Sequence, residues 1–248
     1  MKINKISIIG LGYIGLPTAA IFASKKIKVV GVDVNEKIVN TINQGKIHIV
    51  ENDLDSLVGK VVKQGYLKAT TKPESADAFF ITVPTPFKGK NFKPDLSFII
   101  SACKSISSKL KAGNIVVLES TSPVGTTEKI SEWLAKARPD LTFPHTHGKK
   151  SNIRIAYCPE RVLPGKILHE LVHNDRIIGG MTSKCSDITS KIYKLFVKGK
   201  LDYTNPRTAE MSKLTENSFR DVNIAFANEL SIICDKLDIN VWDLVKIA

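Results

Sequence analysis

The sequence has no long apolar run, and this shortage excludes one class of protein at the outset. A membrane-spanning helix needs roughly 18 consecutive apolar residues, and glycines and a proline interrupt the nearest candidate, residues 6–21. The first residues carry basic charge but neither the apolar region nor the small-residue cleavage site of a signal peptide. We therefore expect a cytoplasmic protein with no membrane partner.

Cysteine is also scarce, and its spacing excludes the common metal and disulfide frameworks. Cys103, Cys158, Cys185 and Cys234 lie far apart, form no C-x-x-C pair and have no histidine at metal-ligand spacing. The pattern predicts isolated structural thiols in a reducing compartment and no metal site.

Aromatic residues make up only 7% of the chain, whereas basic residues outnumber acidic ones by 36 to 24. The formal net charge of +12 would suit a nucleic-acid binder, but the lysines are spread over most of the chain without an aromatic platform. We favour a lysine-rich solvated surface that also suits anionic small ligands, and we expect no nucleic acid as partner. A basic nucleic-acid binder is the distant alternative.

Short apolar runs alternate with helical patterns over most of the chain. Predicted strands cover residues 5–10, 27–34, 78–83, 114–119, 154–157 and 176–180, and predicted helices cover residues 16–24, 35–43, 95–110, 126–137 and 182–197. Strands that alternate with helices of this length indicate an α/β fold with a doubly wound parallel sheet.

The pattern changes after residue 204. Residues 206–236 contain no glycine and no proline beyond Pro206, which predicts one helix of about 45 Å that starts at Pro206. Residues 238–240 break this helix, and residues 241–248 begin a shorter one. The core face of the long helix is expected to consist of Met211, Thr215, Ser218, Val222 and Phe226. We expect a long connecting helix and the start of a helical dimerisation domain.

Residues 10–15, Gly-Leu-Gly-Tyr-Ile-Gly, form the pattern G-x-G-x-x-G directly after the first predicted strand. In this setting Gly10 allows a tight turn, Gly12 lets a pyrophosphate approach the backbone, and Gly15 lets helix and strand pack closely. The helix that follows offers unpaired N–H groups to the phosphates. The sequence therefore predicts a Rossmann-type dinucleotide-binding domain over residues 1–204, with the connecting helix and its continuation over residues 205–248.

Asp33 ends the second predicted strand, and its charge indicates which dinucleotide binds. A carboxylate at this position accepts hydrogen bonds from the ribose hydroxyls of NAD and repels the extra phosphate of NADP. No arginine follows to hold such a phosphate, although Lys37 is near. NAD is therefore the expected cofactor.

Thr85 and Thr121 follow predicted strand ends, where the ligand crevice of an open α/β sheet lies. Their hydroxyls can bond to ribose, to the nicotinamide amide or to a bridging water. They can instead cap the local backbone, and the sequence leaves both possibilities open.

Four further segments carry a resemblance to one enzyme family. They are residues 83–86 (VPTP), 119–127 (ESTSPVGTT), 157–165 (YCPERVLPG) and 210–220 (EMSKLTENSFR). In this order behind the glycine loop, they resemble the nucleotide-sugar 6-dehydrogenases, which oxidise the primary alcohol of a UDP- or GDP-linked sugar to a carboxylate. The motif sequences are most similar to those of members that act on UDP-N-acetyl-D-mannosamine, since the UDP-glucose enzymes have a second acidic residue where this chain has Pro164.

The resemblance implies roles for individual residues. It places NAD contacts at Tyr13, Ile14, Asp33, Thr85 and Thr127, with Thr121 beside both the cofactor and the reaction. It puts Glu160 in the active site, where it positions water or acts as a base, and it puts Arg161 and the backbone of Val162 against the substrate. It puts Lys213 and Asn217 beside the reacting alcohol and makes Arg220 a substrate-binding cation. The alternatives are a surface ion pair for Glu160 and Arg161 and a solvated polar stripe for Glu210, Lys213, Asn217 and Arg220.

The resemblance also implies a component that the printed sequence does not contain. The family oxidises the sugar twice, with two NAD per sugar, and uses a cysteine in a glycine-rich loop for the second step. No such loop occurs within the 248 residues, and the C-terminal UDP-binding domain is absent. We expect an incomplete form of a UDP-sugar dehydrogenase that forms a homodimer. The alternatives are a UDP-glucose or UDP-N-acetylglucosamine 6-dehydrogenase and a non-catalytic NAD-binding or dimerising module.

Overall fold

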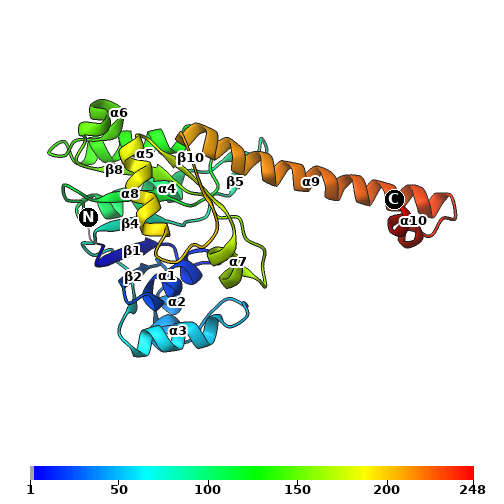
Figure 1. Cartoon of the computed structure of the whole chain (residues 1–248), viewed down its shortest axis with the longest axis horizontal. Helices are drawn as coiled ribbons and strands as arrows, with labels where there is room; N and C mark the ends of the chain where they lie inside the picture. Colours follow the sequence, from blue (N-terminus) through cyan, green and yellow to red (C-terminus); the bar gives the residue numbers. More distant parts are fainter. Residues whose placement is uncertain (1–2) are drawn as a thin grey trace. The chain divides into compact units, whose positions relative to one another are not determined.

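The computed structural model describes residues 3–248, which form two compact units. The first unit ends at Met211 and the second is Ser212–Ala248. The first unit contains an eight-stranded sheet in the order β10-β9-β8-β7-β4-β1-β2-β3, with helices on both faces (Figure 1). The strands are β1 (Lys5–Ile9), β2 (Lys28–Val32), β3 (Leu67–Thr70), β4 (Ala78–Ile81), β7 (Ile115–Leu118), β8 (Arg154–Tyr157), β9 (Arg176–Gly180) and β10 (Leu201–Thr204).

The helices of this unit connect the strands in chain order. They are α1 (Gly15–Ser24), α2 (Glu36–Asn43), α3 (Leu54–Lys63), α4 (Ser97–Ser107), α5 (Thr126–Ala137), α6 (Pro144–His147), the 3-10 helix η1 (Gly148–Lys150), α7 (Ile167–His173) and α8 (Ser183–Tyr193). A small antiparallel hairpin, β5 (Phe87–Lys88) and β6 (Lys93–Pro94), stands apart from the main sheet. The sequence did not predict α3, β3, this hairpin, α6, η1, α7 or β10.

Six neighbouring strands of the main sheet are parallel and follow the Rossmann order: β3, β2, β1, β4, β7 and β8. The Rossmann-type prediction is therefore confirmed, with one correction. β9 is antiparallel to β8, and β10 is parallel to β9, so the last two strands run opposite to the others. Between β8 and β9 the chain forms only α7, whose seven residues span about 10 Å, so no full crossover helix returns the chain for a parallel pairing.

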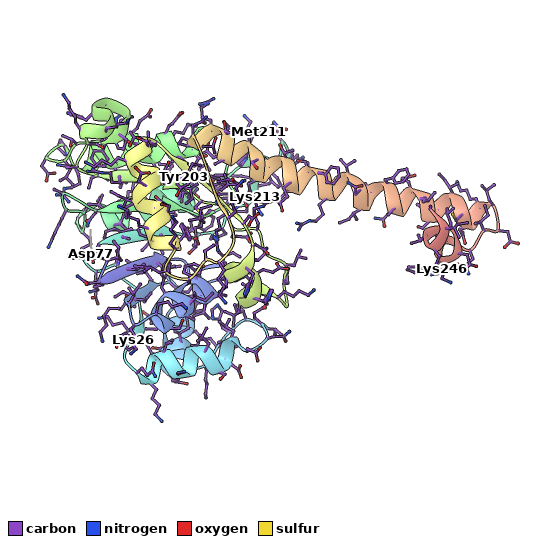
Figure 2. All side chains as sticks on the ribbon, viewed as in Figure 1. Lys26, Asp77, Tyr203, Met211, Lys213 and Lys246 are labelled. Atoms are coloured by element: carbon purple, nitrogen blue, oxygen red, sulfur yellow. The ribbon has the colours of Figure 1, made fainter. Side chains whose placement is uncertain are left out.

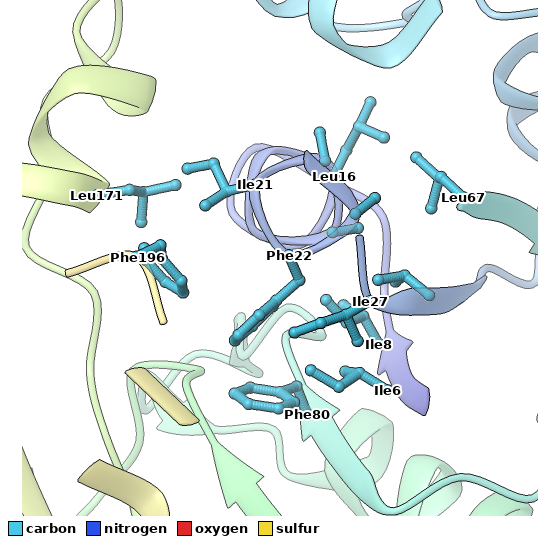
Figure 3. Packing of buried hydrophobic residues seen from close by; sticks show 14 of the residues in the cluster. Ile6, Ile8, Leu16, Ile21, Phe22, Ile27, Leu67, Phe80, Leu171 and Phe196 are labelled. Carbon is cyan, nitrogen blue, oxygen red and sulfur yellow. The ribbon is translucent and has the colours of Figure 1, made fainter. Parts of the chain in front are cut away.

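Apolar residues fill both faces of the sheet. Every residue of α1 from Gly15 to Ala23 is buried, so this helix lies in the middle of one layer. Phe22 points from α1 to Phe80 and Phe196, with ring centroids 5.2 Å and 4.9 Å apart (Figure 3). Each such buried side chain stabilises the fold by about 1.5–3 kcal/mol. The packing fixes the start of α1, which carries the glycine loop.

The second unit consists of most of α9 (Pro206–Lys236) and α10 (Val241–Ile247). The helix starts at Pro206 as predicted, and the Asn240 side chain accepts a hydrogen bond from the Trp242 N–H at 3.0 Å to begin α10. Among residues 3–248, no helix combines the length and apolar content that crossing a membrane requires.

The predicted core face of α9 is wrong. Met211, which is labelled in Figure 2, is 55% exposed. Val222 and Phe226 are 67% and 66% exposed, and Thr215 and Ser218 are exposed too. At the start of the helix, the buried residues are instead Pro206, Ala209, Glu210 and Lys213. The hydrophobic pattern identified an apolar side correctly, but a pattern does not say that the described chain covers it.

Candidate functional site

The loops after β1, β2, β4, β7 and β8 enclose a cavity of about 670 Å³ in the first unit. The cavity lies at the carboxyl ends of the parallel strands, around the point between β1 and β4 where the strand order reverses. The predicted active-site residue Glu160 lines the cavity. Seven predicted cofactor residues line it too: Gly10, Gly12, Tyr13, Ile14, Asp33, Thr85 and Thr121. The fold therefore brings together residues that lie up to 150 positions apart in the sequence, from Gly10 to Glu160.

The three glycines of the loop have three separate structural roles. Gly10 has φ +98°, and a Cβ there would stand 2.8 Å from the carbonyl oxygen of Thr82. A Cβ on Gly15 would stand 1.8 Å from the carbonyl oxygen of Gly10, so helix and turn meet without a side chain between them. Gly12 has nothing within 4 Å of its Cβ position and faces open space. These contacts fit a dinucleotide whose pyrophosphate passes over Gly12.

The start of α1 is prepared for an anion. No side chain caps this helix, and its first turn contains no acidic residue, so the positive end of the helix dipole is uncompensated. Thr82 supports the turn beneath, because its Oγ1 donates to the carbonyl oxygens of Gly10 at 2.7 Å and Ile9 at 3.0 Å. Thr82 also lines the cavity, and the sequence analysis missed it.

Asp33 is held in place by backbone groups. Its Oδ2 accepts a hydrogen bond from the Leu11 N–H at 3.0 Å, and its Oδ1 accepts one from the Asn35 N–H at 2.9 Å. Each oxygen keeps a lone pair for a ligand hydroxyl. Burial lowers the pKa of nearby His48, although the charge of Asp33 opposes this, so His48 is neutral at pH 7 and leaves the carboxylate charge in place.

Thr85 and Thr121 join two of the loops. The Thr85 hydroxyl donates to the backbone carbonyl of Thr121 at 2.6 Å, so it can only accept from a ligand. The Thr85 hydroxyl therefore fixes the backbone of another loop and not that of its own turn. The Thr85 residue also lines the cavity, and its contact with a ligand stays a prediction.

Thr127 is different. Its side chain is fully buried outside the cavity lining, and its hydroxyl donates to Glu210 Oε1 at 2.7 Å. The Glu210 carboxylate also accepts from the N–H groups of Gly125 at 2.6 Å and Thr127 at 2.8 Å, which caps α5. The expectation of a solvated polar stripe is wrong for Glu210, which is 0% exposed. The NAD contact at Thr127 stays a prediction. In this structure the Thr127 hydroxyl is bonded to Glu210 and does not face the cavity.

The loop that carries Glu160, Arg161 and Val162 is held by a residue that is distant in the sequence. Within it, Glu160 Oε2 accepts from the Val162 N–H at 2.9 Å. The buried carboxylate of Glu51 accepts from the N–H groups of Gly165 and Ile167, both at 2.8 Å. We name this pair of bonds the Glu51 tether. The sequence analysis missed it because 114 residues separate Glu51 from Gly165.

Lys213, Asn217 and Arg220 belong to the second unit. The uninterrupted helix α9 puts them at spacings of four and three residues, so they share one helix face as predicted. Arg220 Nη2 lies 3.6 Å from Glu216 Oε1 on the same helix. Their roles toward substrate stay predictions.

All four cysteines are free and buried, as the sequence predicted. Burial raises the pKa of the Cys158 thiol to about 11 and that of the Cys103 thiol to about 12. Within residues 3–248, no group of three or more histidine, cysteine or acidic side chains is placed to bind a metal ion.

Curated relatives are similar over the full chain. A UDP-N-acetyl-D-mannosamine dehydrogenase of Campylobacter jejuni is 67% identical over 247 residues, and an NDP-N-acetyl-D-galactosaminuronic acid dehydrogenase of Ralstonia nicotianae is 63% identical over 243 residues. These alignments cover 100% and 98% of this chain but 61% and 57% of the relatives. The chain therefore spans only about three fifths of the length of the curated relatives it matches.

Solved structures and family profiles agree with this similarity. The structure of a UDP-D-ManNAc dehydrogenase from Pyrococcus horikoshii superposes with a TM-score of 0.91 at 40% identity, over 98% of this chain and 57% of that one. The profile for the central domain of the UDP-glucose/GDP-mannose dehydrogenase family matches residues 207–248, and that for its NAD binding domain matches residues 4–197. The chain belongs to the UDP-glucose/GDP-mannose dehydrogenase family.

Proposed function

We propose that this chain is the cofactor-binding part of an enzyme that oxidises UDP-N-acetyl-D-mannosamine to the corresponding uronate for surface-polysaccharide synthesis, with two NAD per sugar. The observation that supports this most strongly is the carboxyl-edge cavity, where the open side of Gly12, the uncapped start of α1 and Asp33 stand together with Glu160. The proposal includes a cytoplasmic location.

The proposed chemistry assigns distinct tasks to the predicted residues. Bound NAD would supply the hydride acceptor. Lys213, with Asn217 beside it, takes the proton of the sugar alcohol or stabilises the alkoxide. Arg161 and Arg220 bind the anionic substrate, for which a guanidinium fork suits the diphosphate. Glu160 positions the water of the hydrolytic step.

Cofactor selectivity tests the first part of this proposal. Because the Asp33 carboxylate repels a 2′-phosphate, calorimetric titration should show NAD binding at least tenfold more tightly than NADP, about 1.4 kcal/mol. Asp33→Ala should narrow the gap, whereas Asp55→Ala, which removes an exposed charge from α3, should not. Equal affinities in the unmodified chain would exclude the assignment of Asp33.

Substrate choice is the finer part of the proposal. The NDP-N-acetyl-D-galactosaminuronic acid dehydrogenase of Ralstonia nicotianae is nearly as similar to this chain as the relative from Campylobacter jejuni, at 63% against 67% identity. Ligand-observed NMR with the NADH-loaded chain should show contact with UDP-N-acetyl-D-mannosamine but not with UDP-glucose. A preference for UDP-N-acetylgalactosamine would instead favour a function like that of the Ralstonia nicotianae relative.

The exposed apolar side of α9 supports a homodimer. Ile224, Phe226 and Ile233 are at least half exposed in the single chain. A twofold contact with a second copy is the commonest way to cover such a surface. Sedimentation equilibrium at micromolar concentration should give about twice the chain mass of 27.3 kDa. Phe226→Glu should give monomers, while Phe87→Glu, at an equally exposed site on β5, should leave the dimer intact; monomers in the unmodified chain would refute the proposal.

A further inference from the structure

A buried charged pair lies at one end of the cavity. The side chain of Glu119, which follows β7, is fully buried, and that of Arg176 at the start of β9 is 3% exposed. Arg176 Nη1 stands 3.9 Å from Glu119 Oε1, and the Tyr193 hydroxyl donates to the same oxygen at 2.5 Å. Glu119 Oε2 has no hydrogen-bond partner within the described structure. None of the predicted roles uses this pair, which we name the Glu119–Arg176 pair.

The position of the pair relates it to one half of the cofactor. In a Rossmann sheet, the half formed by β1, β2 and β3 receives the adenosine, and the half beyond β1 receives the second nucleotide. Glu119 lines the cavity on this second half, together with Thr121 and Glu160. The nicotinamide ring of a bound NAD belongs at this end.

The charge state of the pair follows from burial. Arg176 is charged at any pH that a protein tolerates, and it is packed under the rings of Tyr193 and Phe196, with its Cζ 5.0 Å and 6.0 Å from their centroids. Burial raises the pKa of Glu119, whereas Arg176 and the Tyr193 hydroxyl act in the opposite direction. A buried guanidinium without a counter-charge is costly, so Glu119 is ionised beside it.

We propose that the Glu119–Arg176 pair sets the relative affinity of this site for the two redox forms of the cofactor. The inference rests on the proposed binding of NAD. The nicotinamide ring is cationic in NAD and neutral in NADH, so a charge near it stabilises one form over the other. With both members present, the Glu119 carboxylate balances the charge of Arg176, and removing Glu119 leaves a buried positive charge beside the ring. Removing Arg176 instead lets Glu119 take up a proton, because burial raises the pKa of this carboxyl, and the site stays neutral.

The test is a cycle of variants, with the dissociation constants of NAD and NADH measured by calorimetry. Glu119→Gln leaves the positive Arg176, so the ratio of the NAD constant to the NADH constant should rise about fivefold to tenfold. Arg176→Met leaves a buried Glu119 that takes up a proton, so the ratio should stay close to that of the unmodified chain. The double variant should return close to the ratio of the unmodified chain.

Glu74→Gln is the matched control. Glu74 is an ion-paired carboxylate whose Oε2 lies 2.7 Å from Lys5 Nζ at the amino end of β1, and Glu74 itself does not line the cavity. Its loss should not change the ratio.

The outcomes separate the two levels of the argument. If the unmodified chain binds neither NAD nor NADH, the proposed function fails. If it binds both and Glu119→Gln leaves the ratio constant, or if Arg176→Met raises the ratio as Glu119→Gln does, the Glu119–Arg176 inference is overturned. Should Glu119→Gln not fold, Arg176→Met decides the question, because its ratio should fall as the pH is raised and Glu119 loses its proton, and a ratio that is constant with pH overturns the inference.

Discussion

Gly12→Ala should leave the fold intact and weaken NAD binding by about a hundredfold. Nothing lies within 4 Å of the added Cβ in the protein, so the new methyl group occupies only the space through which the pyrophosphate would pass. Thermal unfolding should be unchanged, and calorimetric titration should show the loss of affinity, equivalent to about 2.7 kcal/mol.

Gly15→Ala is the matched comparison, because this change should lower the stability of the fold. Its Cβ would stand 1.8 Å from the Gly10 carbonyl oxygen, so α1 must move away from the turn. Overpacking of this kind costs about 3 kcal/mol or more, and the melting temperature should fall by about 10 °C. Unchanged NAD affinity in a folded Gly12→Ala variant would show that the dinucleotide does not pass over the glycine loop.

The second large effect concerns turnover. With UDP-N-acetyl-D-mannosamine and NAD, the 248-residue chain should not complete the second oxidation, so no uronate and no steady formation of two NADH per sugar should be measurable. The family resemblance requires a reactive cysteine for the second oxidation, and all four cysteines of this chain are buried. With a pKa of about 11, Cys158 is a thiolate in only about one molecule in ten thousand at pH 7.

Thiol titration checks the same point independently of substrate. An aromatic disulfide reagent should modify almost no cysteine in the native chain and all four after unfolding in guanidinium chloride. Steady formation of two NADH per sugar would contradict the prediction. In that case Cys158, which lies beside Glu160 in the sequence, is the first candidate nucleophile, and Cys158→Ser would have to abolish turnover.

The sequence predicted the parts of the site that depend on neighbouring residues. The glycine loop and Asp33 are recognisable because a strand, a turn, a helix and a second strand follow one another within about 30 residues. The parts it missed depend on pairs that are distant in sequence. Glu119 is paired with Tyr193 across 74 residues, and Glu210 caps α5 across more than 80. No local pattern marks either carboxylate.

Two errors in the fold have a similar origin. β10 (LDYT) contains no buried residue, so the apolar pattern that reveals a central strand is missing from this edge strand. On α9, periodicity located the apolar side of the helix, but burial depends on what packs against that side. Burial of Ala209 and Glu210 at the start of the helix was therefore beyond the reach of periodicity.

The Glu51 tether also determines the order in which this site can be assembled during folding. Glu51 lies in the segment between α2 and α3, and its two partners lie more than 110 residues further along the chain. On the ribosome, the first three strands and their helices are complete long before Gly165 is synthesised. The loop that carries Glu160 then packs against Glu51, which is already in place. The conformational entropy of closing this long loop is lost only in that late step.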